Sequence, residues 1–502
     1  MRTKKQLYPD YTAEIEYLRE NGVDQFILHK IIQKHRGNAR YNRALYKRYM
    51  VLDNALPIFK RTPRFQQENP INNKLNDDFF GEIIDFKTGY FAGKPITYSY
   101  SKGEEAQKET GGEEAVKAAA QAVTDFTTRN NMYGCDMEIT KFASMCGYAG
   151  RLMYIDTDGN ERCMPVPAHE CIFLSDAQNI CEPNFALRYY RTEDINGAKQ
   201  WYVEFYDDTM IHSYKGQLNA LEESEAKPHL FDYCPFQGIA NNREMLGDAE
   251  KVLTLIDDYD KVLSDNSNEV EAFVHAYLIF EGLRIDDETI AKGQKSGSFV
   301  IPATGTQQGK AYFLTKNIND AFTEHHLERL EKLIYRFSRT PNLSDESFGS
   351  ASGISLKFKL HGLETKCGMF QAKMMDAANY MWKVLASAWR KKTITVNPLH
   401  VTMDFKRNFP LDIQNEAAAA QTLISAGLPK EFVYSQLSFV DDVDAIMEAI
   451  EEEKESTEDY YKEAADKIKS AISKNDGEEN AENEENAEEK QPDDQKKKKQ
   501  VI

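Results

Sequence analysis

Two stretches of the chain, residues 241–273 and 316–340, repeat their apolar positions at intervals of three and four. In the first stretch, the repeating positions are Leu246, Ala249, Leu253, Ile256, Tyr259 and Leu263. In the second stretch, they are Ala321, Phe322, His325, Leu330, Leu333, Ile334 and Phe337. This spacing places side chains on one face of an α-helix, and Pro341 blocks continuation of the second helix. The pattern therefore predicts two amphipathic helices.

The first of these helices also carries acidic residues away from its apolar face. They are Asp248, Glu250, Asp257, Asp258, Asp260 and Asp265. A two-metal site is one interpretation of the central three, but neighbouring carboxylates on a helix point in different directions. We therefore predict a solvated acidic face and no metal site.

Between the two helices, apolar runs at 276–280, 299–301 and 311–314 indicate short strands. A Pro- and Gly-containing loop, 302–309, separates the last two runs. With a short helix near 286–292, the insert is expected to be a small β unit.

The remaining sequence mixes helical and strand patterns, which predicts an α+β fold. The first hundred residues look largely helical, residues 102–112 read as an exposed loop, and a helix is expected over 113–129. Strands are expected at 152–155, 171–174, 185–190 and 201–206, where short apolar runs and aromatic or β-branched residues occur.

Further along, apolar residues recur at helical spacing over residues 354–392, which favours one long helix. A strand is expected over 393–401 and short helices over 414–450. Residues 475–502 hold ten acids and five lysines with almost nothing to bury, which predicts disorder.

A Gly/Ser-rich segment follows the second amphipathic helix and leads into the long helix. It contains Ser344-Asp345-Glu346-Ser347-Phe348-Gly349, then Ser352-Gly353-Ile354-Ser355-Leu356-Lys357-Phe358-Lys359-Leu360 and Leu363-Glu364. It resembles the tunnel loop and tunnel helix of tailed-bacteriophage portal proteins, in the family that includes the portal of phage SPP1. Residues 85–98 resemble that family's helix-to-strand passage, and Pro235-Phe236 before the acidic helix is a third match in the same order.

The resemblance implies a multi-domain portal fold with long helices, a small β clip and assembly into a ring. Its divisions would be a wing at 1–240, with the first forty residues matching poorly, and stem helices at 241–273 and 316–340. The clip would be 274–315, the tunnel loop 341–353, the long tunnel or wing helix 354–392, the crown 393–450, and an acidic tail 451–502.

As a portal, the chain would form the head-tail connector at the capsid vertex for DNA packaging and ejection. Its implied partners are other copies of itself, with twelve in the ring, and double-stranded DNA held without sequence specificity. The other implied partners are the terminase large subunit, the head-completion or adaptor protein, and the capsid and scaffolding proteins. The implied location is the virion, with assembly in the host cytoplasm.

The resemblance also assigns residues to roles. DNA-facing loop residues would be Asp345, Glu346, Ser347, Phe348, Gly349, Ser350, Ala351, Ser352 and Gly353. Tunnel-helix residues would be Lys357 and Lys359. Partner-binding clip residues would be Pro302, Thr304, Gly305, Gln307 and Gln308.

Charge and composition narrow the function without the resemblance. A net charge of −19 argues against a protein that grips DNA through many phosphate contacts, yet suits a conduit through which a duplex slides. The seven cysteines lack metal-binding spacing and are expected to be reduced and buried. No apolar run approaches the length of a membrane span, so we expect a soluble, cytoplasmic product.

The sequence contains no complete catalytic motif of the classes considered for a packaging enzyme. Gly93-Lys94 lacks the rest of a phosphate-binding loop, and His325-His326 lacks the order of a zinc protease motif. We therefore expect no enzymatic activity, no cofactor and no metal. The alternatives to a portal are a terminase-like packaging enzyme and a structural adaptor of the virion without a channel.

Overall fold

The computed structural model describes residues 8–454, with gaps at 53–54, 64–70, 177–178, 194, 275–276, 282–287, 289–309, 315–319, 343–352 and 409–412 and at several positions after 435. The chain divides into two units, one ending at Phe409 and the other beginning at Pro410. Helices and sheets are both abundant in the first unit, which confirms the α+β class.

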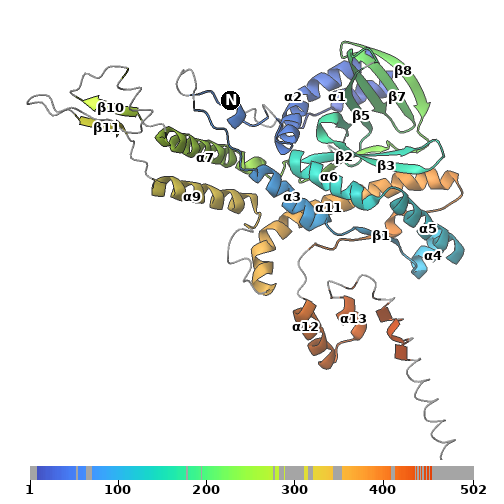
Figure 1. Cartoon of the computed structure of the whole chain (residues 1–502). Helices are drawn as coiled ribbons and strands as arrows, with labels where there is room; N and C mark the ends of the chain where they lie inside the picture. Colours follow the sequence, from blue (N-terminus) through green and yellow to red (C-terminus); the bar gives the residue numbers. More distant parts are fainter. Residues whose placement is uncertain are drawn as a thin grey trace, which may run out of the picture. The chain divides into compact units, whose positions relative to one another are not determined.

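Two N-terminal helices cover one face of a five-stranded antiparallel sheet of order β4-β5-β6-β7-β8 (Figure 1). The elements are α1 (Thr12–Asn21), α2 (Gln25–Tyr49), β4 (Cys171–Leu174), β5 (Phe185–Glu193), β6 (Lys199–Tyr206), β7 (Met210–Gln217) and β8 (Ala220–Pro228). Leu28 and Ile31 of α2 pack with Leu187 and Val203 of the sheet. The positions facing the helices alternate along β4, β5 and β6, and the residues between them, such as Phe173 and Ala186, are buried in a second core cluster on the other face.

A smaller sheet of order β3-β2-β9 lies beside helix α6 (Met132–Cys146). Its strands are β2 (Tyr148–Ile155), β3 (Glu161–Pro167) and β9 (Phe236–Ala240). The segment 156–160 forms the β2–β3 hairpin turn, closed by a hydrogen bond from the Asp156 amide to the Asn160 carbonyl. The four strands expected between 152 and 206 are therefore confirmed.

Two expectations for this part of the molecule are wrong, one in the type of element and one in its position. Residues 102–112 contain helix α4 (Glu104–Thr110), which buries Ala106 against α5 (Glu113–Arg129) and β1 (Thr97–Tyr100). The strand expected at 393–401 instead lies at β12 (Val401–Asp404), after a short 3₁₀ turn. Its partner is β1, about three hundred positions away, so local sequence did not reveal its register.

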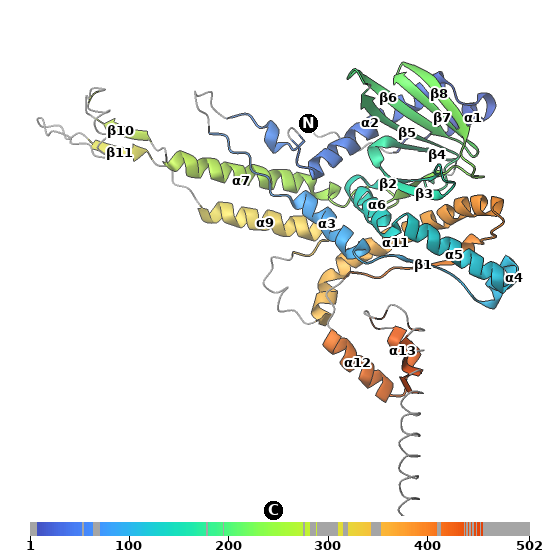
Figure 2. The ribbon, with the colours of Figure 1, turned by 45° about the vertical axis from the view of Figure 1, so that its right-hand side comes forward.

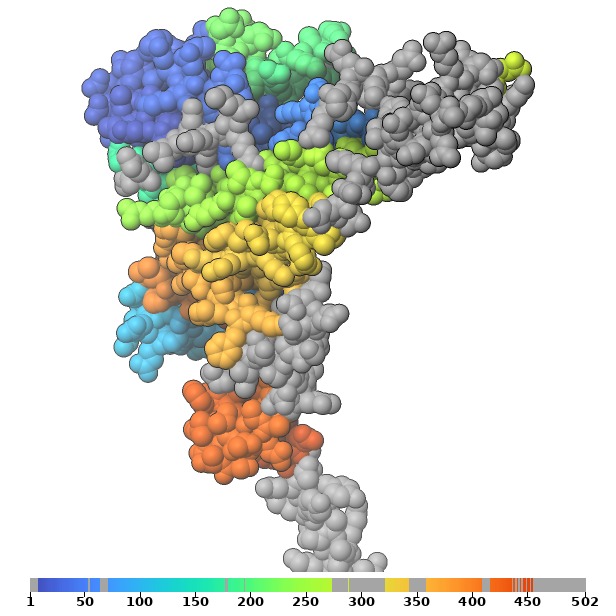
Figure 3. All heavy atoms as spheres, turned by 90° about the vertical axis from the view of Figure 1, so that its left-hand side faces the viewer, coloured from blue at the N-terminus to red at the C-terminus, as the bar shows by residue number. Residues whose placement is uncertain are grey.

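Helices α7 (Leu253–Val274) and α9 (Asp320–Ser338) lie side by side and antiparallel, and the hairpin of β10 (Tyr277–Glu281) and β11 (Lys310–Leu314) follows α7 (Figure 2). Figure 3 shows the atoms of α7 and α9 as adjacent bands, with α11 (Gly353–Lys391) next to α9. The long helix runs into the main core, where Phe370, Met381 and Trp382 are buried. The helices expected at the two amphipathic stretches and at 354–392 are thus confirmed.

The first amphipathic helix begins later than its pattern suggested. The chain from 241 to 249 is a loop in which Asn242 accepts a hydrogen bond from the Leu246 amide and Met245 takes a positive φ of 52°. A single 3₁₀ turn, η3 (Glu250–Val252), leads into α7. Ala249 precedes the helix but is buried in the core that Val252 and Ile256 also enter, whereas Leu246 is partly exposed and lines the cavity beside Asp248.

The second unit contains α12 (Ile413–Ser425) and α13 (Lys430–Ser435), as expected for short helices after 414. Within the part of the chain that the structure describes, no helix has both the length and the apolar character needed to cross a bilayer. All seven cysteines are free thiols, and six of them are buried. The expected burial is therefore found for six of them, and Cys163 is partly exposed.

Candidate functional site at the junction of the long helices

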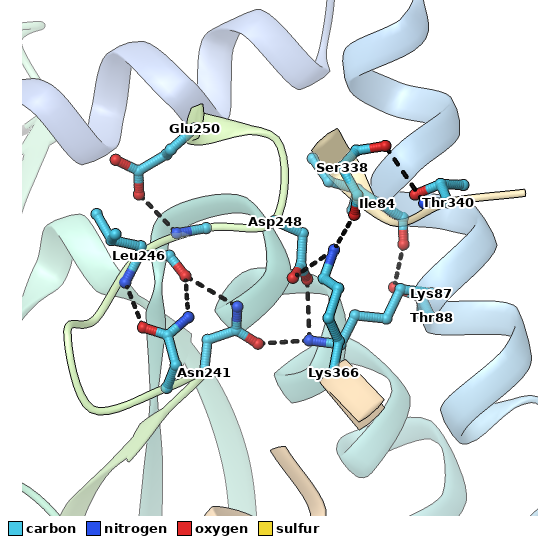
Figure 4. A network of polar contacts seen from close by, with 12 residues as sticks. Ile84, Lys87, Thr88, Asn241, Leu246, Asp248, Glu250, Ser338, Thr340 and Lys366 are labelled. Atoms are coloured by element: carbon cyan, nitrogen blue, oxygen red, sulfur yellow. Dashed lines mark hydrogen bonds and ion pairs between the residues drawn. The ribbon is translucent and has the colours of Figure 1, made fainter. Parts of the chain in front are cut away.

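A buried carboxylate joins three segments of the chain that are far apart in sequence (Figure 4). Asp248 lies in the loop before α7, Lys87 comes from α3 (Phe79–Ala92), and Lys366 comes from α11. The Lys87 ammonium lies 2.9 Å from one carboxylate oxygen, and the Lys366 ammonium lies 3.0 Å from the other. This network therefore fixes the base of α7 to α3 and to the long helix.

All three side chains are almost completely removed from water, with exposed fractions of 3% for Asp248, 1% for Lys87 and 12% for Lys366. Burial alone would raise the pKa of the Asp248 carboxyl, but the two ammonium groups hold that pKa well below its usual range. Burial lowers the pKa of Lys366, an effect that Asp248 partly offsets. The cluster therefore contains an ionised aspartate between two lysines.

Further hydrogen bonds connect the cluster to the surrounding backbone. Lys87 donates to the Asn241 side chain, whose amide nitrogen donates to the Leu246 carbonyl at 2.9 Å. Lys366 donates to the Ser338 carbonyl, at the last residue of α9, at 2.7 Å. The two lysines thus hold the loop before α7, and Lys366 also holds the last residue of α9.

The loop that presents Asp248 also requires a glycine. A Cβ atom at Gly247 would lie 2.4 Å from the Met145 carbonyl oxygen and 2.8 Å from that of Ser144. The Asp248 amide donates to the same Ser144 carbonyl at 2.8 Å. Close backbone contact with the end of α6 therefore sets the position of the carboxylate. A cavity of about 360 Å³ opens beside it, with Phe337 and Met369 on its wall.

Aromatic side chains pack α3 between α7 and α9. The centre of the Phe79 ring lies 5.0 Å from the ring centre of Tyr259 in α7 and 5.6 Å from that of Tyr335 in α9, and both pairs are edge to face. The Tyr335 hydroxyl donates to the Glu82 carboxylate at 2.8 Å. Edge-to-face pairs of this kind add stabilisation beyond area burial, so α3 holds the two helices in register.

The segment 71–77 runs along α7 and is bonded to it at regular intervals. The Asp77 amide donates to Asp260 at 3.0 Å, the Leu75 amide to the Ser264 hydroxyl at 2.9 Å, and the Asn73 amide to Asn268 at 2.6 Å. Four helical residues advance about 6.0 Å, and two extended residues advance about 6.6 Å. Every fourth residue of α7 therefore lies beside every second amide of the segment 71–77. We call this segment the strap.

The strap covers part of the α7 face that was expected to be acidic and solvated. Asp260 is 1% exposed, and burial raises its pKa to about 6. Asp257 pairs with Arg48 at 2.6 Å, and Asp265 pairs with Arg61. The prediction of a solvated face was wrong for Asp248, Asp257 and Asp260, because α2, α3 and the strap cover them. Asp265 keeps 33% of its side chain exposed.

Asp258 is the half-exposed member of the central three acids, and it lies 3.7 Å from His326 of α9. Among the described residues, no group of three His, Cys, Asp or Glu side chains is placed to hold a metal ion. The three carboxylates instead make separate contacts with three different elements.

Most residues that the sequence assigned to DNA or partner contact lie outside the described residues. This applies to the loop residues 345–352 and to the clip residues 302–308. Gly353 is the first residue of α11, and Lys357 lies in its second turn, with its side chain outside the description. Lys359 lies in the same helix and is partly buried. Their roles stay predictions.

Sequence reasoning missed Lys87 and Lys366 as functional candidates. Lys87 stands inside the segment 85–98 that resembles the portal wing, so the motif held a signal that helical spacing does not use. Lys366 falls two residues after the last residue of the tunnel-helix match, on the buried side of an otherwise apolar stripe. A lysine on an apolar face indicates a buried partner, because an unpaired buried ammonium is costly.

Comparison with known proteins agrees with this architecture. Residues 28–460 match the family described as phage portal protein, SPP1 Gp6-like. The portal protein of Bacillus phage SPP1 is 24% identical over 460 residues, which cover 86% of each chain. The portal protein of Clostridium phage phiCD119 is 25% identical over 344 residues, 64% of this chain and 73% of that protein. The chain therefore belongs to the SPP1 Gp6-like family and is a phage portal protein.

Proposed function

We propose that copies of this chain form a ring, twelve in number, around a channel that passes double-stranded DNA into and out of the capsid. Residues 241–273 and 316–340 would be the stem and 274–315 the clip, which would dock the terminase large subunit and later the head-completion or adaptor protein. Residues 1–240 would be the wing and 393–450 the crown, and capsid and scaffolding proteins would contact the assembled ring. Residues 354–392 would link stem, wing and crown.

The observation that carries this proposal is the buried Lys87–Asp248–Lys366 junction. It fixes the loop before α7 and the last residue of α9 to Lys366 of α11, and the segment 341–353 connects α9 to α11. A loop anchored at both ends on rigid elements can change conformation without disturbing the body that carries it. We assign residues 345–353 as the DNA-facing loop on this basis.

Exposed apolar side chains near the junction supply a surface for a second copy. Phe337 of α9 is 56% exposed and Met369 of α11 is 50% exposed, and both line the cavity beside Asp248. In a ring each subunit offers two different faces to its neighbours, so an apolar patch on one flank needs a complementary flank. We place the lateral contact of adjacent subunits here.

Negative-stain images and mass photometry of the purified protein test the ring. We expect rings with a central hole for the native chain, and mostly monomers for Phe337→Ser combined with Met369→Ser. The control is Ile195→Ser combined with Leu399→Ser, which removes two exposed apolar side chains elsewhere. Native-like rings from the Phe337/Met369 variant would remove this surface from the contact, and absence of rings from the native chain would overturn the ring itself.

The DNA-facing loop has its own test. Gly349→Pro combined with Ser352→Pro restricts backbone motion, so we expect normal rings but reduced DNA packaging in vitro. Normal packaging at normal ring yield would contradict a moving loop, while leaving the ring proposal intact.

A further inference from the structure

A basic groove lies between α2 and the five-stranded sheet, away from the junction. It has a volume of about 480 Å³. Four arginines line it: Arg36, Arg40 and Arg43 from α2, and Arg191 from β5. Positions 36, 40 and 43 are spaced by four and three residues, so they share one face of the helix. The groove is thus a line of guanidinium groups facing a sheet.

Among the described residues that line this groove, none carries a carboxylate. Among the described residues, none of the four arginines forms an ion pair, although Glu170 interacts electrostatically with Arg43 from outside the lining. The guanidinium of Arg191 lies 4.9 Å from the ring centre of Trp201. In a chain of net charge −19, this concentration of unbalanced positive charge is a local exception, and it attracts anions.

The groove is preformed by buried contacts beneath it. His35 of α2 is fully buried between the hydroxyls of Tyr189, at 3.0 Å, and Tyr148, at 3.1 Å. The His29 ring hydrogen-bonds the Leu218 carbonyl at 3.0 Å, which ties the helix to the β7–β8 turn at the groove edge. The arginines therefore project from a fixed helix, and binding an anion there requires little ordering of the backbone.

The shape favours a peptide over a DNA duplex. A cavity of about 480 Å³ accepts a few side chains, whereas the major groove of DNA alone is about 12 Å wide. Tyr189 and Trp201 also line the groove, and their rings offer a peptide apolar contacts that duplex phosphates cannot use. Acidic side chains on an extended peptide can enter and form bidentate pairs with arginine.

The chain itself contains an acidic peptide of this kind. Residues 475–489 read NDGEENAENEENAEE, with eight acids and neither lysine nor arginine. They follow residue 460, where the match to the portal family ends. We propose that this acidic segment, from the same or a neighbouring copy, occupies the basic groove formed by α2 and the sheet. The proposal does not depend on the channel function.

Occupancy would have a consequence for DNA. Exposed arginines bind phosphates without sequence specificity and release counterions as they do so. A tail that covers them keeps this surface from holding DNA. The acidic segment would therefore act as an internal competitor of phosphate at this site.

Limited digestion of the full chain with a glutamate-specific protease tests the contact. At low salt we expect cleavage within 475–489 to be about ten-fold slower in the native chain than in Arg36→Gln/Arg40→Gln/Arg191→Gln, because three charge pairs are lost. Arg→Lys at the same three positions should restore part of the protection. Lys108→Gln/Lys117→Gln, which removes two exposed charges from α4 and α5, should behave as the native chain.

A titration identifies the ligand. The receptor is the full chain with the eight acids of 475–489 replaced by Asn or Gln, and the probes are a labelled 475–489 peptide and a 20-base-pair duplex. We expect the peptide to bind, about ten-fold more weakly to the Arg→Gln variant, and to lose affinity in high salt. Equal cleavage of the tail in native and Arg→Gln chains would overturn the proposal. So would a groove that binds the duplex and not the peptide.

Discussion

At the scale of single residues, the junction depends on an uneven count of charges. Two lysines and one aspartate are buried together, so the cluster carries one positive charge in excess. Phe370 lies beneath the Lys87 ammonium at 4.5 Å and offers the face of its ring to that charge. Replacing the aspartate and replacing a lysine should therefore have unequal costs.

We expect Asp248→Asn to destabilise the protein by about 3–5 kcal/mol, because it leaves two buried ammonium groups without a counter-charge. Lys366→Met should cost less, since Asp248 and Lys87 still form a balanced pair. Unfolding in urea, followed by fluorescence, measures both. Lys373→Met, on an exposed part of the same helix, serves as the control and should change stability by under about 0.5 kcal/mol. A larger loss of stability in Lys366→Met than in Asp248→Asn would contradict this argument from the charge count.

The pKa of Asp260, raised to about 6 by burial, gives a pH dependence of defined sign. The folded state binds this proton more tightly than the unfolded state, so the residue's contribution to stability falls as pH rises from about 4 to about 6. Asp260→Asn removes the buried charge, and the asparagine oxygen can still accept the hydrogen bond from the Asp77 amide. We expect the variant to be more stable than the native chain by about 1 kcal/mol at pH 8, with the gain vanishing near pH 3.5. Thermal unfolding at both pH values checks this, and a difference independent of pH would contradict it.

At the scale of elements, α7 is held on two sides by segments from the first hundred residues. The strap bonds to positions 260, 264 and 268, while α3 packs against Tyr259. An amphipathic helix needs a partner for its apolar stripe, but this one also uses its polar face. Polar side chains on that face replace the backbone partners that an irregular strap lacks.

Ser264→Ala should release the strap at its centre. The Leu75 amide would lose its acceptor, with an expected cost of about 1–3 kcal/mol if it stays buried. Hydrogen exchange at Leu75 and Asp77 should become faster in this variant. Ser267→Ala lies on the same helix but removes no bond to the strap, and it should leave these amides protected. Unchanged exchange in Ser264→Ala would show that other contacts hold the strap.

At the scale of the whole molecule, the first unit closes its core with residues near its end. Val401 is buried in the main core and Arg407 forms a bidentate pair with Glu364 of the long helix, with nitrogen–oxygen distances of 3.0 Å. β12 also completes the two-stranded pair with β1. No residue beyond 409 belongs to the described core clusters of this unit.

We therefore expect a chain ending at residue 409 to fold with the thermal midpoint of the first unit almost unchanged, within about 2 °C. A chain ending at residue 396 loses β12 and the Glu364 partner, and should lose at least about 5 °C or aggregate. Differential scanning calorimetry of the two truncations compares them directly. Equal midpoints would show that residues 397–409 do not complete this core.

Sequence alone determined the elements that repeat with a clear period and the family to which they belong. The helices at α5, α7, α9 and α11 and the strands β2, β4, β5 and β6 follow local hydrophobic spacing, which depends only on neighbouring residues, whereas β3 was not predicted. Motif order gave the portal family, which the match over 28–460 confirms.

Only the tertiary structure decided which charges are buried. Asp257 and Asp260 lie on the face of α7 that the helical period assigns to water, yet each is covered by a segment more than 150 residues away. Periodicity defines a face of a helix but not what packs against it. A buried charge is tolerated only where a partner of opposite charge or a hydrogen-bond donor arrives, and that arrival is a property of the folded chain.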